Sequence, residues 1–188
     1  APVKTSTSLV NIIKDTAEFV LSGSSIKCNV EFENNLHNAL VDPTQISQVI
    51  HNIILNARQA IKGQGTITIT AKNATLDDPG IPVKGNFIAI SIHDTGEGIP
   101  PDIMPYIFDP FFTTRDGGHG LGLSIAYSIV KKHDGHITVN SSKEGTLFTI
   151  YLPVAPPNET SVYETTESYC TPSKSHILIM DDDALIAE

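Results

Sequence analysis

The sequence is short of basic residues and of cysteines, and it has no long apolar run. Twelve Lys and Arg stand against twenty-one Asp and Glu in 188 residues, which gives a formal net charge of -9. Nucleic acids and anionic membranes attract the opposite balance, so we expect neither nucleic acid binding nor membrane contact. No apolar stretch approaches the roughly 20 residues of a membrane helix, and no segment resembles a signal peptide.

Cys28 and Cys170 are the only cysteines, and neither belongs to a CxxC pair. This usage excludes a disulfide framework and a cysteine zinc site, and it fits a reducing compartment. We therefore predict a cytoplasmic location, and the sequence leaves open whether the parent protein has a membrane anchor upstream. Because the chain stops at Glu188 soon after an acidic cluster, we interpret it as a piece of a longer protein.

Apolar spacing divides the chain into helices and strands. Steps of three and four residues predict helices over residues 8–21 and 43–62 and from residue 122 to the turn at 134–135. Alternation predicts strands over residues 27–32, 66–72, 87–93, 136–140, 146–152 and 176–180. The clearest helix start has Asp42 as N-cap, Pro43 in the first turn and Gln45 as capping-box partner.

This order of elements predicts an α+β fold, a two-layer α/β sandwich with the helices packed on one face of a mixed sheet. We divide the chain into four segments. Residues 1–26 form an N-terminal helix or connector, and residues 27–153 form the compact domain. Residues 154–175, rich in Pro, Ser, Thr and Glu, have the composition of a flexible linker, and residues 176–188 are an apolar strand that ends in acids.

The segment from Asp94 to Pro100 reads Asp-Thr-Gly-Glu-Gly-Ile-Pro and follows an apolar strand. Side chains alternate along a strand, so we expect Asp94 on the face beneath the helices. A carboxylate there needs a donor, and the exocyclic amine of adenine is a suitable one. Gly96 and Gly98 would let the backbone approach a flat ligand. The alternative interpretation is a simple Asx turn.

Two further patterns suit the phosphates of a nucleotide. The glycine-rich run at 117–123 precedes a helix, and exposed amides at a helix N-terminus bind phosphate, although such a loop alone is weak evidence. Asn52 and Asn56 lie one helical turn apart and offer neutral oxygen ligands for Mg²⁺. For an arbitrary pair of asparagines, solvated surface amides are the better interpretation.

Five sequence blocks occur in order and at sensible intervals: residues 48–57, 94–100, 107–114, 118–126 and 144–148. Together they resemble the ATP-binding catalytic domain of sensor histidine kinases, within the GHKL superfamily that includes type II topoisomerases. The resemblance covers roughly residues 27–153. It implies the Bergerat fold, with ATP and Mg²⁺ bound between sheet and helices.

The resemblance also implies site residues. Asn56 would be the Mg²⁺ ligand with Asn52 beside it facing the phosphates, and Asp94 would accept the adenine amine. The other ATP-binding residues implied are Gly96, Gly98, Ile99, Phe108, Gly118, His119, Gly120, Leu121, Gly122, Leu123 and Thr146, while Phe111 and Phe112 join Phe108 in packing the lid. ATP-hydrolysing relatives carry a general-base carboxylate at the position of Asn52, so the amide favours phosphoryl transfer to a histidine.

The family's phosphoacceptor histidine lies on a helical hairpin, and no histidine here has that context. We interpret all of them, His119 and His133 included, as surface or pocket-lining side chains, and so expect no autophosphorylation in cis. The resemblance implies two partners: the histidine-containing dimerisation domain of the parent protein, and a receiver domain or response regulator. Residues 177–183 resemble the first strand and acidic corner of a receiver domain, which implies a hybrid kinase.

Two other functions remain open from the sequence. One is a non-catalytic ATP-dependent regulatory module of the same fold, and the other is an ATPase of the same superfamily.

Overall fold

The computed structural model describes residues 2–77, 82–115 and 118–156. Its strands are β1 (Thr5–Thr7), β2 (Ile26–Phe32), β3 (Ala39–Val41), β4 (Gly65–Leu76), β5 (Gly85–Asp94), β6 (His136–Ser142) and β7 (Gly145–Pro153). Its helices are α1 (Leu9–Leu21), α2 (Pro43–Ala60) and α3 (Gly122–Lys132), with a short 3₁₀ helix at Met104–Tyr106.

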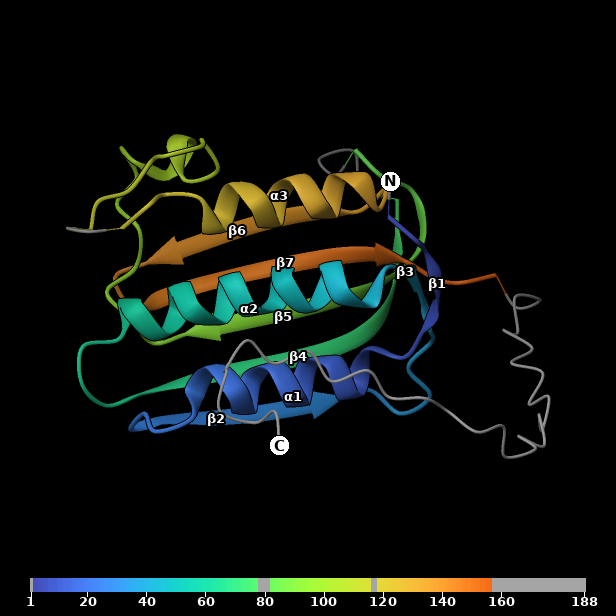
Figure 1. Ribbon diagram of the computed structural model, residues 1–188, viewed down its shortest axis with the longest axis horizontal. Coiled ribbons are helices and arrows are strands. Elements are labelled where there is room, and N and C mark those ends of the chain that lie inside the picture. Colours follow the sequence, from blue (N-terminus) through green and yellow to red (C-terminus); the bar gives the residue numbers. More distant parts are fainter. Residues whose placement is uncertain (1, 78–81, 116–117, 157–188) are drawn as a thin grey trace, which may run out of the picture.

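The five longer strands form one sheet in the order β2-β4-β5-β7-β6. Strands β2 and β4 are parallel and the other neighbours are antiparallel, so the sheet is mixed. All three α-helices lie along the same face of this sheet (Figure 1). The predicted α+β sandwich is therefore confirmed. The predicted strand at 176–180 and most of the linker lie outside the described residues.

The small sheet of β1 and β3 was not predicted. Thr5 pairs with Val41 and Thr7 with Ala39, over only three residues on each side. A run that short shows no measurable periodicity, and its pairing joins residues far apart in the sequence. Within the described residues, no helix combines the length and apolar content that crossing a bilayer requires.

Helix α1 shares the main core. Leu9 and Ile13 have no exposed surface and pack among the same buried residues as helix α2. Arg58 of α2 donates to the main-chain oxygen of Val20 over 2.7 Å, which ties the end of α1 to α2. The packing has no break at residue 27, where the sequence suggested a segment boundary.

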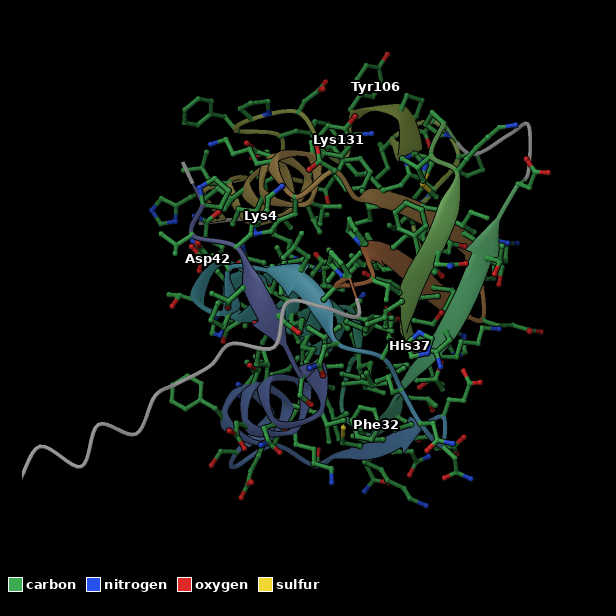
Figure 2. The ribbon with its side chains drawn as sticks, turned by 90° about the vertical axis from the view of Figure 1, so that its right-hand side faces the viewer. Lys4, Phe32, His37, Asp42, Tyr106 and Lys131 are labelled. Carbon is green, nitrogen blue, oxygen red and sulfur yellow. The ribbon has the colours of Figure 1, made fainter. Side chains whose placement is uncertain are left out.

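Helix α2 begins as predicted, with one difference. The carboxylate of Asp42 accepts from the backbone amides of Thr44 and Gln45, as an N-cap should. The capping-box prediction is wrong, however, because the amide of Asp42 donates to His133 Nε2 over 3.0 Å and not to Gln45. Lys4 and Asp42 lie close together beside this end of the helix (Figure 2), where the amide of Val3 also donates to Asp42.

His133 is fully buried, so its prediction as a surface or pocket-lining side chain is wrong. Nδ1 lies 2.8 Å from the main-chain oxygen of Ile129, while Nε2 accepts from Asp42. In this pattern Nε2 is an acceptor and Nδ1 is placed to donate. A position at the end of a helix suggested exposure, but both ring nitrogens are satisfied by backbone groups, which allows burial.

Replacing His133 with alanine should destabilise the domain. The change leaves the Asp42 amide without its acceptor and opens a cavity, which together cost about 2–4 kcal/mol in the free energy of unfolding. Urea unfolding measures this loss. The control is His37→Ala, which removes an exposed histidine. Similar urea midpoints for the two variants would contradict a stabilising role for the hydrogen bonds of His133.

Candidate functional site

Asp94 lies at the end of strand β5, opposite Thr146 of β7 and Ile67 of β4. Only 1% of its surface is exposed. Oδ1 accepts from the backbone amide of Gly96 over 2.8 Å. Of the buried side-chain nitrogen and oxygen atoms in the described part of the chain, Oδ2 of Asp94 is the one without a hydrogen-bond partner. The fold therefore leaves a buried acceptor for a donor supplied from outside.

Burial raises the pKa of the Asp94 carboxyl, and the amide of Gly96 opposes this rise. An unpaired buried carboxylate is costly, so its retention at this position points to a binding role. A ligand N–H at Oδ2 would satisfy the carboxylate. The exocyclic amine of adenine fits this requirement.

A small hydroxyl network lies next to Asp94, around its strand partner Thr146. Thr146 is buried, and its Oγ1 lies 2.9 Å from Ser141 Oγ. Ser141 Oγ also accepts from the amide of Ile99 over 2.8 Å. These contacts hold the loop after β5 against the turn between β6 and β7, and the pairing of β5 with β7 places Thr146 opposite Asp94.

The loop after β5 needs glycine at two positions, because neighbouring atoms leave no room for a side chain there. A Cβ on Gly96 would lie 2.7 Å from Ala60 Cβ and from Asp94 Oδ1. A Cβ on Gly98, where φ is +74°, would lie 1.8 Å from the main-chain oxygen of Ser142. The loop therefore takes its path only with glycine at both positions, because other parts of the protein lie where a side chain would be; the predicted approach to a flat ligand stays a prediction.

Asn52 and Asn56 lie on helix α2 and are both half-buried. Asn52 Nδ2 donates to the main-chain oxygen of Gly122 over 3.0 Å, which joins α2 to the start of α3. Asn56 Oδ1 accepts from Arg115 Nη1 over 3.1 Å. A guanidinium of the chain itself therefore contacts the amide oxygen for which the sequence suggested Mg²⁺.

The segment between β5 and α3 is the predicted lid. The amide of Phe111 donates to the main-chain oxygen of Gly120 over 2.9 Å, and both residues have positive φ. Phe108 packs against Tyr127 of α3 with ring centroids 5.0 Å apart, whereas Phe111 is 75% exposed. Phe108 thus anchors the base of the segment.

The remaining predicted residues lie along the entry to α3. Gly118 and His119 are exposed, Leu121 immediately precedes the helix, and Leu123 packs partly against the core. Gly122 is the first residue of the helix, where backbone amides face outward.

Two glycines of this segment should respond differently to alanine. A Cβ on Gly120, at φ +64°, would lie 2.4 Å from the carbonyl carbon of Phe111, whereas on Gly122 it would meet Asn52 at an ordinary 3.8 Å. Gly120→Ala should therefore speed amide hydrogen exchange at Phe111 by about tenfold or more, the effect of 1.4 kcal/mol. Gly122→Ala, the matched control, should leave that exchange rate unchanged. Equal rates in the two variants would contradict this account of the lid.

Sequence reasoning missed Arg115, Ser141 and Gly145. Arg115 directly follows the block at 107–114, and its charge beside glycines was the available signal. A Cβ on Gly145 would lie 1.8 Å from the main-chain oxygen of Asp94. Ser141 gave no signal, because only the pairing of β6 with β7 brings it to Thr146.

The structure brings the predicted residues into three groups along the C-terminal half of α2: the surroundings of Asp94, the asparagine pair and the glycine-rich entry to α3. A buried acceptor, amide oxygens and a helix N-terminus in one α+β domain are the groups that a nucleotide would need.

Comparison with known proteins identifies the family. The model of the histidine kinase-, DNA gyrase B-, and HSP90-like ATPase family matches residues 41–156. The chain therefore belongs to this family.

The individual relatives are sensor histidine kinases. The sensor histidine kinase ZraS of Salmonella typhi is 36% identical over 146 residues, covering 77% of this chain and 29% of that protein. The sensory histidine kinase/phosphatase NtrB of Vibrio alginolyticus is 36% identical over 155 residues, covering 80% of this chain and 44% of that protein. The solved catalytic domain of the histidine kinase ThkA is similar with a TM-score of 0.67 and 28% identity, over 82% of this chain and 96% of that structure.

The chain spans less than half the length of these two curated relatives, while it covers nearly all of the solved catalytic domain. Within the family it is thus a catalytic domain of the histidine kinase type.

Proposed function

We propose that this chain is the catalytic ATP-binding module of a two-component sensor histidine kinase. In this proposal it transfers the γ-phosphoryl group of ATP to a histidine of the parent's dimerisation domain, which lies outside this sequence, and ADP leaves. The observation that carries the proposal is the buried Asp94 Oδ2, which lacks a partner in the described part of the chain within a domain whose relatives are sensor histidine kinases.

Asp94 would accept a hydrogen bond from the adenine amine through Oδ2 and so select the base. Gly96 and Gly98 would form the pocket floor, since their backbone already lies against α2 and the β6–β7 turn. Ile99 and Thr146, held by Ser141, would line the same pocket.

Asn56 would offer its amide oxygen to Mg²⁺, and Asn52 would face the phosphates beside it. Bound Mg²⁺ would neutralise charge on the phosphates as the bond to the leaving ADP breaks. The backbone amides from Gly118 to Leu123, at the N-terminus of α3, would hold the phosphate oxygens, with Phe108 anchoring this segment through Tyr127.

Asn52 supports transfer to a histidine over hydrolysis. Its amide nitrogen donates to Gly122, and a carboxamide does not accept a proton from water as a general-base carboxylate does. An imidazole nucleophile needs mainly alignment with the phosphoryl group and charge neutralisation. The partners would be the dimerisation domain and then a receiver domain or response regulator.

The test mixes this chain with the separate histidine hairpin domain of its parent and with ATP labelled at the γ-phosphate. We expect acid-labile label on the hairpin, and none when the acceptor histidine of the hairpin is replaced by alanine. Phosphate released into water in place of transfer would indicate an ATPase. ATP binding without either reaction would indicate a regulatory module.

A further inference from the structure

The cation that contacts Asn56 belongs to the chain itself. Arg115 Nη1 donates to Asn56 Oδ1 over 3.1 Å, and Nη2 donates to the main-chain oxygen of Asn56 over 3.3 Å. The same guanidinium donates to Gln59 Oε1. Asn56 and Gln59 are three residues apart on α2, so their side chains are neighbours that one planar guanidinium can bridge.

The base of Arg115 is fixed in the segment before α3. Its amide donates to Thr113 Oγ1 over 3.1 Å, and its main-chain oxygen accepts from the amide of Gly118 over 3.2 Å. The side chain therefore reaches from the lid segment to helix α2. This contact directly joins the lid to the residue that would ligate the metal.

Two carboxylates act on the charge of the guanidinium. The side chain is exposed, but partial desolvation against α2 lowers the pKa of Arg115, and the charges of Glu97 and Asp94 oppose that lowering. Glu97 itself pairs with Lys62 over 2.6 Å at the surface. The direct contacts of the guanidinium are thus the oxygens of Asn56 and Gln59, and the two carboxylates favour its positive charge.

We propose that Arg115 is a displaceable internal cation that occupies the metal-ligand oxygen of Asn56 until Mg²⁺ and nucleotide bind. The inference rests on the proposed function, because it takes Asn56 as the metal ligand. A guanidinium N–H and a metal ion compete for the same amide oxygen. The bound arginine thus lowers the fraction of molecules competent to bind metal, and it raises the Mg²⁺ concentration that nucleotide binding requires.

The test is a calorimetric titration of ADP at a series of Mg²⁺ concentrations. ADP is the probe because it lacks the γ-phosphate, to which the released arginine could itself bind. In Arg115→Gln the Mg²⁺ concentration for half-maximal ADP binding should fall about two- to fivefold, the range expected for an exposed charged contact. Gln59→Ala should act in the same direction, and the double variant should match Arg115→Gln.

The control is Lys72→Gln, which removes the same charge from an exposed position of strand β4 and should leave the Mg²⁺ requirement unchanged. An unchanged or higher requirement in Arg115→Gln, with wild-type protein binding ADP, would overturn the proposal and leave the nucleotide site standing. Wild-type protein that binds no ADP at any Mg²⁺ concentration would overturn both this inference and the proposed function.

Discussion

Replacing Asp94 with asparagine is expected to remove tight ATP binding from a domain that remains folded. The asparagine keeps an acceptor for the Gly96 amide but places an N–H₂ group where Oδ2 awaits a donor. Losing a hydrogen bond to a charged group costs about 1.5–3 kcal/mol, which is roughly tenfold to a few hundredfold in affinity. Calorimetric titration of Mg²⁺-ATP into both proteins measures this loss.

The same substitution should not destabilise the domain. Burial raises the pKa of Asp94, so the folded state holds its proton more tightly than the unfolded state does. Ionisation of Asp94 therefore destabilises the folded state as the pH rises from the pKa of the unfolded state, about 3.9, toward the higher pKa of the folded state. This destabilisation persists at neutral pH. Asparagine carries no such cost.

Urea unfolding of the two proteins checks the sign of this effect. We expect the variant to be at least as stable as the wild type at neutral pH, with its advantage shrinking at acidic pH. Asp102→Asn, which changes an exposed carboxylate, is the control and should leave the unfolding midpoint unchanged. A variant much less stable than the wild type would mean that lost ATP binding reflects unfolding rather than a lost contact.

Replacing Gly145 with alanine should have the largest effect on stability. Gly145 begins strand β7 with φ +138°, and a Cβ there would lie 1.8 Å from the main-chain oxygen of Asp94. Backbone of β5 and β7 would have to separate where the two strands pair, and we expect a loss of more than about 3 kcal/mol in the free energy of unfolding.

The matched control for this prediction is Gly23→Ala. Gly23 also has positive φ, at +70°, but its added Cβ would meet nothing within 4 Å. Gly23→Ala should lower the free energy of unfolding only by the cost of the left-handed conformation, about 1–2 kcal/mol. Equal shifts of the two urea midpoints would show that the close approach at Asp94 is not what requires glycine at residue 145.

The sequence predicted the features that depend on local patterns. Alternation along β5 placed Asp94 on the covered face, and it is buried there with Ile90 and Ile92. The N-cap at Asp42 and the start of α2 followed from residues within one turn of each other. The fold class followed from the order of such elements.

The features that escaped prediction depend on partners distant in the sequence. His133 contacts Asp42 across 91 positions, and Arg115 contacts Asn56 across 59. A histidine at a helix end and an arginine in a glycine-rich loop give no local sign of distant partners. The packing of α3 beside α2 brings His133 to Asp42, and the path of the segment before α3 brings Arg115 to Asn56. The predicted roles of the glycines between Gly118 and Gly122 stay predictions.

Recognition of the adenine amine by Asp94 is tested most directly by changing the base. Inosine triphosphate carries a carbonyl oxygen where ATP carries the amine, so it offers no donor to Oδ2. Calorimetry with Mg²⁺ should show wild-type protein binding ATP about tenfold or more tighter than inosine triphosphate. Asp94→Asn should lose this preference. Equal affinity of the wild-type protein for both nucleotides would contradict the account.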